Sequence, residues 1–327
     1  MTTSSQGIGR RAALGLVGAT LAAPAIAQPA WPSRPVSVVA TFPPGGSNDF
    51  AARSFAQGFQ QEFGQPAPVD NRSGAAGLIA AEAVARSRPD GYTLLVANFS
   101  VLTMTPHIMD NVALDPLRAF APVSTIIQGA ALFCVHRSVP ARTLEEFAAF
   151  ARAQPGGITY GSSGAGSHMA MEILRAGIGS PPMTHAAYRG SAPLQQDLLP
   201  GRVVATVDSL PALLPHVQAG TLRAILSTGE RRSLILPELP TAIEAGVPNL
   251  VLNNWEGLLA PAGTPGPILE RLNAYIRRIN QDADFRARAL ARGAEPGGDS
   301  VEEFAARIAA DHARWGRAAR DFNIRAG

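Results

Sequence analysis

The sequence predicts an α/β protein that folds into two lobes. Apolar residues make up 46% of the 327 residues and charged residues 16%, a globular composition that can bury one large core or two moderate ones. Strand-like and helix-like segments alternate in two successive blocks, and amphipathic helical segments follow the second block. Two alternating blocks with a helical return favour two lobes over one.

Residues 1–27 have the features of an export signal. Arg10 and Arg11 open the apolar run AALGLVGATLAAPAIA, so we expect cleavage after Ala27 and a mature chain in the periplasm. Paired arginines are typical of the twin-arginine route, and the general secretory route is the alternative. No later run is long and apolar enough to cross a bilayer.

The charged residues and the cysteine exclude several function classes. All 28 basic residues are arginine, which excludes mechanisms that need a lysine, such as a P-loop or a Schiff base. Loss of Arg10 and Arg11 leaves 26 arginines against 25 acidic residues, and no basic stripe supports nucleic-acid binding. The single cysteine, Cys134, cannot form an intrachain disulfide, and its apolar surroundings favour a buried, unreactive thiol.

The first block reads as βαβαβ. We expect strands at residues 36–40 and 67–70, and a turn followed by a third strand over 89–98. We expect a helix at 48–63, and a glycine turn that leads into a second helix over 74–87. Phe55, Phe59 and Phe63 recur at the spacing of one helix face, and Gly64 ends that helix. This order predicts parallel strands joined by right-handed crossovers, with the first and third strands side by side.

The second block repeats the alternation. We expect strands at 131–137, 158–163, 184–188, 203–209 and 222–228, and helices at 143–154, 167–177, 192–201 and 210–220. Two amphipathic helices, near 265–291 and 300–322, end the chain. The connections near 120–130 and 245–258 are extended and apolar, which suits a hinge of two paired crossover strands. One lobe would then hold residues 28–125 and 255–327, and the other residues 126–254.

A rigid corner, TFPPGGSND, joins the first strand to the first helix. Ligands bind beyond the carboxyl ends of parallel strands, so this corner and the segment NFS at 98–100 should face one crevice. The helix start offers free amides, the glycines allow close approach, and Pro43 and Pro44 fix the corner in advance. A carboxylate suits such a site. The alternative is a tight turn whose helix is capped by Asn48 or Asp49, which is compatible with an anion on the remaining amides.

A second corner, YGSSGAGSH, again runs from a strand into a helix. Its free amides at 164–168 and its serine hydroxyls predict that two closing lobes clamp a small anion between two helix starts. His168 either packs at the helix start or contacts the ligand. Arg189 either neutralises a second ligand carboxylate or forms a salt bridge, and Asp208 either accepts hydrogen bonds from the ligand or caps the next helix.

The order of these motifs resembles that of one family. FPPGGSND, NRSGAAG, PDGYTLLVAN, YGSSGAGSHMAMEIL, AYRGSAPLQQDLLPGRV, LPTAIEAGVPN and WEGLLAPAGTP follow one another as in the Bug family, the TctC-type solute receptors of tripartite tricarboxylate transport. The resemblance covers residues 32–324. It implies a type II-like periplasmic-binding-protein fold, with mixed sheets flanked by helices and two crossover hinge strands.

The resemblance also implies the ligand, the partners and the site. The ligand would be a small carboxylate (a di- or tricarboxylate, an acidic amino acid or a similar compound), held largely by backbone amides and ordered water. The partner would be a permease of one large and one small subunit, unless the receptor is an orphan; we expect a monomer with no cofactor and no metal. The implied ligand-binding residues are Phe42, Pro43, Gly45, Gly46, Ser47, Asn48, Asp49, Asn98, Ser100, Ser162, Ser163, Gly164, Ala165, Gly166, Ser167, His168, Tyr188, Arg189, Gly190 and Asp208. Asn48 stands where threonine is more usual, and its added amide donor bears on ligand choice.

Two other functions remain open. An exported hydrolase would use Ser162 or Ser163 with one of six histidines, but GSSGAG lacks the G-x-S-x-G elbow and the histidines are scattered. We therefore expect no enzyme activity. A periplasmic sensor, which presents its liganded state to a signalling partner, would share the sequence features of a transport receptor.

Overall fold

The computed structural model describes residues 2–3, 31–110, 112–188 and 191–325. The predicted signal cleavage site, Arg189 and Gly190 lie outside these ranges. Within them, no helix combines the length and the apolar character that a membrane span requires.

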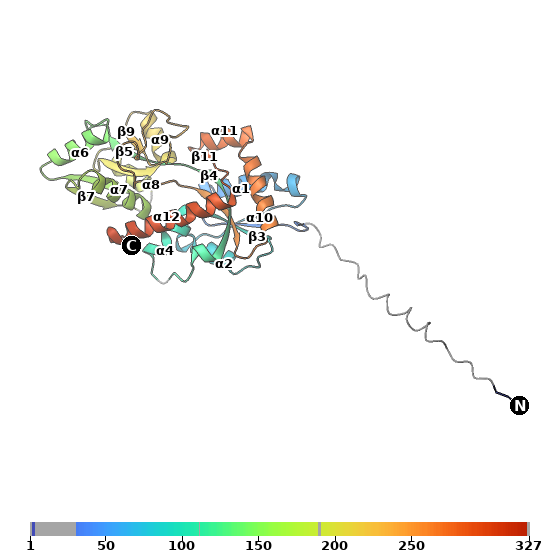
Figure 1. The fold of residues 1–327 in the computed structure, drawn as a ribbon. Coiled ribbons are helices and arrows are strands. Elements are labelled where there is room, and N and C mark those ends of the chain that lie inside the picture. The colour runs from blue at the N-terminus through green and yellow to red at the C-terminus, as the bar shows by residue number, and fades with distance from the viewer. Residues whose placement is uncertain (1, 4–30, 111, 189–190, 326–327) are drawn as a thin grey trace.

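The strands form two sheets, one toward each end of the molecule (Figure 1). The first sheet has the order β11-β4-β10-β3-β1-β2 and the second the order β7-β6-β8-β5-β9. The strand bounds are β1 Ser37–Ala40, β2 Val69–Asn71, β3 Thr93–Asn98, β4 Phe120–Gln128, β5 Ala131–His136, β6 Ile158–Ser162, β7 Met183–Ala187, β8 Ala205–Ser209, β9 Leu222–Ser227, β10 Glu256–Pro261 and β11 Glu295–Pro296. Both sheets contain parallel and antiparallel pairs, which confirms the predicted two-lobe α/β fold with mixed sheets.

The first block forms the predicted parallel unit. Strand β1 pairs in parallel with both β2 and β3, so the first and third strands are neighbours. Helix α1 (Ser47–Phe63) follows β1 and ends at Gly64, whose φ is 72°. A 3-10 turn, η1 (Ala75–Gly77), leads into α2 (Leu78–Ala85), and the short helices α3 (Phe99–Thr103), α4 (Thr105–Ile108) and α5 (Pro116–Ala119) join β3 to β4.

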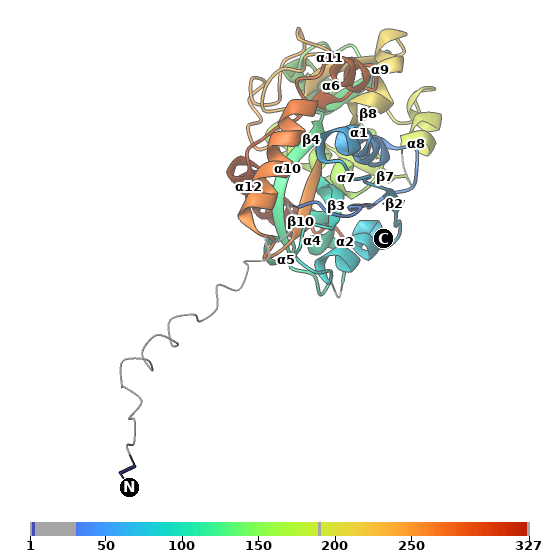
Figure 2. The same cartoon turned by 90° about the vertical axis from the view of Figure 1, so that its right-hand side faces the viewer.

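Helices cover both faces of the first sheet. Val38 and Val39 point to opposite faces, yet their exposed fractions are only 0% and 1%. Helices α1, α10 (Gly266–Ile279) and α11 (Ala283–Ala291) pack on the Val38 face, and α2 and α12 (Val301–Asp321) pack on the Val39 face. Figure 2 shows these helices around β3, β4 and β10. Burial on both faces explains why the strands are continuous apolar runs.

The second sheet is built from the second block. Strand β6 pairs in parallel with β7 and β8, whereas β5 is antiparallel to β8 and β9. Its helices are α6 (Leu144–Ala153), α7 (Ala165–Gly177), α8 (Ser191–Leu198) and α9 (Leu210–Gln218). Cys134 on β5 is fully buried, as predicted, and burial raises the pKa of its thiol.

The prediction of one helix over residues 265–291 is wrong. Helix α10 ends at Ile279, and α11 begins at Ala283. Asp282 caps α11, because its side chain accepts a hydrogen bond from the Phe285 amide at 2.7 Å. An aspartate stabilises a helix start more than a helix interior, so Asp282 was a sequence signal for a new helix. The helical patterns on both sides of it obscured that signal.

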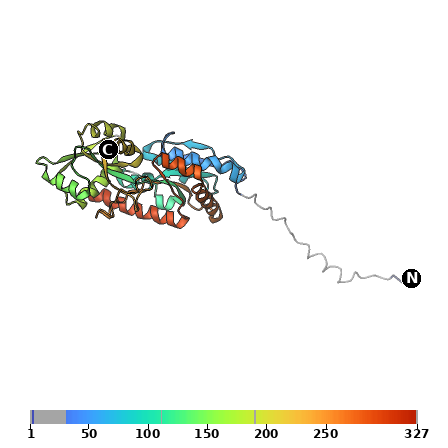
Figure 3. The same cartoon turned by 90° about the horizontal axis from the view of Figure 1, so that it is seen from above.

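The chain crosses between the sheets twice, and the two crossings are paired. Gly129, after β4, exchanges two backbone hydrogen bonds of 3.0 and 2.7 Å with Asn254, just before β10, and Ala130 bridges to Asn253. Helix α12 runs along one side of the molecule (Figure 3) and contacts α7 of the second lobe. The paired residues lie within the two segments, near 120–130 and 245–258, that we expected to connect the lobes. The residue boundaries of the lobes remain a prediction.

Candidate functional site

A cleft of about 750 Å³ opens between the two sheets, beside the paired crossings. Residues from both lobes line it. The predicted site residues among them are Phe42, Ser47, Asn98, Ser100, Ser163, Gly164, Ala165, Gly166, Ser167 and Asp208. Both glycine-rich corners, the first (residues 42–49) and the second (residues 162–168), therefore contribute to one cavity.

The first corner is fixed by its own side chains. Gly45 has a φ of 96°, which a side chain would disfavour, and its amide donates a hydrogen bond to Asp49 at 3.0 Å. Burial alone would raise the pKa of Asp49, but hydrogen bonds, chiefly from Arg53, outweigh it and lower the pKa. Helix α1 begins at Ser47 with Gly46 as N-cap and without a side-chain cap. The predicted cap by Asn48 or Asp49 is wrong, because Asp49 turns back toward Gly45 and Asn48 bonds to the sheet.

Glu256 anchors the first corner, and sequence analysis missed it. Its side chain lines the cleft at the start of β10 and is 2% exposed. It accepts hydrogen bonds from Ser47 Oγ at 2.7 Å, Asn98 Nδ2 at 2.9 Å and Asn48 Nδ2 at 2.7 Å. Burial raises the pKa of Glu256, and these donors oppose the rise. An acid inside the apolar run WEGLLAP was the available sequence signal.

The side-chain amide of Asn48 makes all its hydrogen bonds to other groups of the protein. Its Oδ1 accepts a hydrogen bond from the Thr41 amide at 2.8 Å, and its Nδ2 donates to Val96 O at 3.0 Å as well as to Glu256. Asn48 is 2% exposed and is not among the residues that line the cleft. In this structure the Asn48 amide therefore does not face the cleft, and it acts on the cleft only by its hydrogen bond to Glu256.

The second corner is held by packing and by hydroxyls. Helix α7 begins at Ala165 with Gly164 as N-cap, and Ser167 Oγ donates a hydrogen bond to the Val207 carbonyl of β8. A Cβ at Gly166 would lie 3.0 Å from Sδ of Met104, which precedes α4 on the other side of the cleft. The glycine therefore allows the two lobes to approach each other closely.

Asp208 lies at the end of β8 and lines the cleft, with 7% of its surface exposed. Burial raises its pKa, an effect that the Ser191 and Ser163 hydroxyls and the Ser209 amide oppose. Of these groups, the Ser209 amide makes a well-formed hydrogen bond, at 2.7 Å to Oδ1. Oδ2 has no hydrogen-bond partner of ordinary geometry in the described part of the chain. Asp208 does not cap α9, because it precedes the N-cap Ser209.

A partly buried cluster adjoins the second corner. Ser162 Oγ lies 2.7 Å from His185 Nε2, and the His185 ring stacks on His168 with centroids 3.7 Å apart. Burial lowers the pKa of both histidines, and the charge of His185 lowers that of His168 further. Ser162 and His185 have the spacing of a nucleophile and its base, but Ser162 is 2% exposed and does not line the cleft. A substrate would have little access to it.

Several predicted site residues do not line the cleft in this structure. They are Pro43, Gly45, Gly46, Asn48, Asp49, Ser162, His168 and Tyr188. Tyr188 instead donates its hydroxyl to Asp197 at 2.8 Å. Arg189 and Gly190 lie outside the described residues. That these residues contact the ligand remains a prediction.

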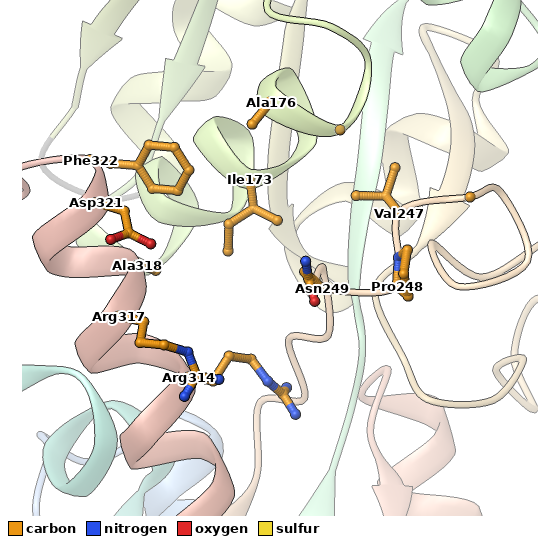
Figure 4. A pocket seen from close by; sticks show the side chains of 12 residues that line it. Ile173, Ala176, Val247, Pro248, Asn249, Arg314, Arg317, Ala318, Asp321 and Phe322 are labelled. Carbon is orange, nitrogen blue, oxygen red and sulfur yellow. The ribbon is translucent and has the colours of Figure 1, made fainter.

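A second cavity, of about 420 Å³, lies between α7, residues 246–249 and α12 (Figure 4). Arg314 lines it, donates a hydrogen bond to Val251 O at 2.8 Å and pairs with Asp311 at 3.4 Å. None of the predicted site residues lines it. Across the described ranges, no group of three His, Cys, Asp or Glu side chains is placed to hold a metal ion. The cleft between the lobes is therefore the candidate site.

Sequence comparison finds relatives along almost the whole chain. The pattern of the family described as "Tripartite tricarboxylate transporter family receptor" matches residues 51–324. Protein BugT of Bordetella pertussis is 32% identical over 315 residues, which cover 94% of this chain and 96% of BugT. The UPF0065 protein in the tcbD-tcbE intergenic region of Pseudomonas sp. strain P51 is 32% identical over 325 residues, 98% of this chain and 96% of that protein.

Solved structures of similar sequence share the fold. Rpa4515 of R. palustris, solved with adipate, is 34% identical with a TM-score of 0.74, covering 90% of this chain and 99% of that one. MatC (Rpa3494) from Rhodopseudomonas palustris, with bound malate, is 29% identical with a TM-score of 0.69, covering 88% and 99%. A TctC solute-binding protein from Polaromonas, without ligand, is 26% identical with a TM-score of 0.79, covering 89% and 99%.

Proposed function

The chain belongs to the tripartite tricarboxylate transporter receptor family, and we propose that it captures a small carboxylate solute in the cleft between its lobes. One observation carries this proposal: two glycine-rich corners, one from each sheet, line the same cavity. The adipate of Rpa4515 and the malate of MatC support carboxylates as the ligand class.

The two helix starts supply the attraction for a carboxylate. The first amides of α1 and of α7 have no partner within their helices, and each macrodipole adds about half a positive charge at its N-terminus. The hydroxyls of Ser47 and Ser163 line the same cleft and provide further donors. Such main-chain recognition is fixed before binding, so little ordering entropy is lost.

Closure of the lobes would complete the site. We assign residues 28–125 and 255–327 to one lobe and residues 126–254 to the other. The paired crossings at Gly129 and Asn254 would then act as the hinge. The approach of Met104 to Gly166 supports a closing motion that brings the two corners together.

The family supports a transport role in the cell. We assign the protein to the periplasm after removal of residues 1–27, as a monomeric binding protein without catalytic activity. It would deliver its solute to a membrane permease of one large and one small subunit.

Calorimetry and thermal melting of the mature chain test this function. Succinate, malate, adipate, citrate and aspartate are the probes, and the corresponding neutral amides are the controls. At least one acid should bind and raise the Tm, since a ligand at 100 times its Kd adds about 2.7 kcal/mol to stability. Its binding should also reduce the radius of gyration in solution scattering. Failure of every carboxylate to bind, or turnover of a carboxylate ester, would contradict the proposal.

A further inference from the structure

The cleft of this proposed carboxylate receptor contains two buried acids. Asp208 enters it from the second sheet and Glu256 from the first, with exposed fractions of 7% and 2%. Among the described residues that line the cleft there is no arginine and no histidine. A plain dicarboxylate would bring further negative charge to a place where the described side chains carry only negative charge.

We propose that Asp208 and Glu256 form a subsite for a protonated amine, so that the preferred ligand is a small amino carboxylate rather than a dicarboxylate. This inference rests on the proposed function, because the helix starts are needed to hold the carboxylate end. It assigns the other end of the ligand to two side chains of opposite lobes.

Asp208 provides the strongest support. Its Oδ1 accepts a hydrogen bond from the Ser209 amide at 2.7 Å, whereas Oδ2 has no partner of ordinary geometry in the described residues. A carboxylate oxygen that is buried without a donor loses its hydration without compensation. An ammonium group in the cleft would supply both the missing donor and the compensating charge.

Glu256 has room for one more donor. An ionised carboxylate accepts about four hydrogen bonds. Ser47 and Asn98 donate to Oε1, and Asn48 donates to Oε2. One acceptor position therefore remains on Oε2. The Ser47 and Asn98 side chains, which we predicted to hold the ligand, already direct donors to Glu256 and present this acid as part of the cleft lining.

A cationic partner would favour the charged form of both acids when the cleft closes. Burial raises the pKa of Asp208 and of Glu256, because desolvation disfavours the ionised form. An ammonium between them would reverse this effect at both groups. It would also favour closure, since the two acids come from different sheets.

Matched probes of equal chain length test the subsite by calorimetry. The pairs are 4-aminobutanoate and succinate, 6-aminohexanoate and adipate, and aspartate and succinate. In the wild-type protein, at least one amino carboxylate should bind about 10 to 100 times more tightly than its dicarboxylate partner, as expected for one or two hydrogen bonds to a charged group. Asp208→Asn should abolish this preference while leaving dicarboxylate binding equal or stronger, and Glu256→Gln should act in the same direction.

Asp311→Asn is the matched control. Asp311 is 8% exposed, burial raises its pKa, and it accepts a hydrogen bond from Trp255 at 3.0 Å, but it does not line the cleft. This variant should keep the wild-type preference. Asp208→Asn keeps an oxygen that can accept the hydrogen bond from the Ser209 amide, so this variant should also fold with wild-type stability.

Two outcomes overturn the inference, and they can be told apart. If dicarboxylates bind as tightly as their amino partners, the amine subsite is wrong and the carboxylate receptor stands; loss of that binding in Arg189→Gln would assign the far end of the ligand to Arg189 instead. If neither class binds, the proposed function fails together with the subsite.

Discussion

The first and second corners both lead from a buried strand into a helix start, but different contacts hold them. In the first corner, Ser47 and Asn48 donate hydrogen bonds to the buried acid Glu256. In the second, Ser167 donates a hydrogen bond to a backbone carbonyl, and two stacked histidines lie alongside. A buried acid thus supports the first corner, whereas a backbone carbonyl and ring stacking support the second.

Because different contacts hold the two corners, different changes should disturb them. Removal of a single carboxylate should disturb the first corner, because several donors share it. Protonation should disturb the second corner, because partial burial lowers the pKa of both its histidines. If both corners offer backbone amides to the ligand, as we propose, substitutions that add bulk should affect both alike.

The largest effect is expected for Glu256→Ala. It removes the side-chain acceptor of Asn98 Nδ2 and one of the two acceptors of Asn48 Nδ2, and Asn48 is too buried for water to replace the lost one. We expect a loss of about 3 kcal/mol in the free energy of unfolding, from unsatisfied buried donors and a cavity. Urea denaturation measures it. Glu270→Ala, an exposed position on α10, is the control and should leave the midpoint unchanged; a similar midpoint for both variants would refute the anchoring role of Glu256.

Added bulk at the helix starts should reduce ligand binding about 100-fold, which is about 2.7 kcal/mol. Gly46 and Gly164 are the N-caps of α1 and α7, and a Cβ at either position meets no atom within 4 Å. Gly46→Val and Gly164→Val should therefore fold normally and lose binding of the best carboxylate in calorimetry. Gly45→Val serves as a contrast, because its φ of 96° predicts a loss of stability instead. Wild-type affinity in both N-cap variants would place the ligand elsewhere.

The sequence predicts the two corners better than it predicts the residues that hold them in place. The order of strand, glycine-rich turn and helix is local, so both corners and the parallel β3-β1-β2 unit could be inferred from pattern alone. Glu256 lies 208 residues from Asn48 in the chain and is next to it only after β10 joins the first sheet. The break at Asp282 was missed for another reason: a capping residue between two amphipathic stretches does not interrupt the apolar pattern enough to be noticed.

Mild acid should weaken the second corner before the first. The pKa values of His168 and His185 are lowered from the ordinary value of 6.5, so the unfolded chain takes up protons before the folded one does. The contribution of these two histidines to stability is therefore constant above pH 6.5 and falls below it, until the lowered pKa values are passed. We expect the Tm to drop by roughly 2 to 4 °C for each kcal/mol lost between pH 7.5 and 5.5.

Local measurements assign this drop to a region. Amide hydrogen exchange, corrected for its intrinsic pH dependence, should rise at residues 162–168 while residues 42–49 stay protected. The lowered pKa of Asp49 keeps that carboxylate ionised, and proton uptake by Glu256, whose pKa burial raises, does not destabilise the folded state relative to the unfolded chain. Replacement of His168 and His185 by glutamine should remove part of the Tm drop. The remainder would come from His107 and His312, whose pKa values burial also lowers. Equal loss of protection at both corners would remove the distinction between them.

The smallest effect is expected for the same serine deletion made in each corner. Ser47 is exposed, so water can replace its hydroxyl at Glu256, and Ser47→Ala should cost about 0.5 kcal/mol of unfolding free energy. Ser167 is 8% exposed and its acceptor is the Val207 carbonyl of a fully buried residue, so Ser167→Ala should cost about 1 kcal/mol. Because the two serines bond to separate networks, the double variant should show the sum of the two losses in urea denaturation. A coupling between them larger than about 0.5 kcal/mol would mean that the corners already support each other without a ligand.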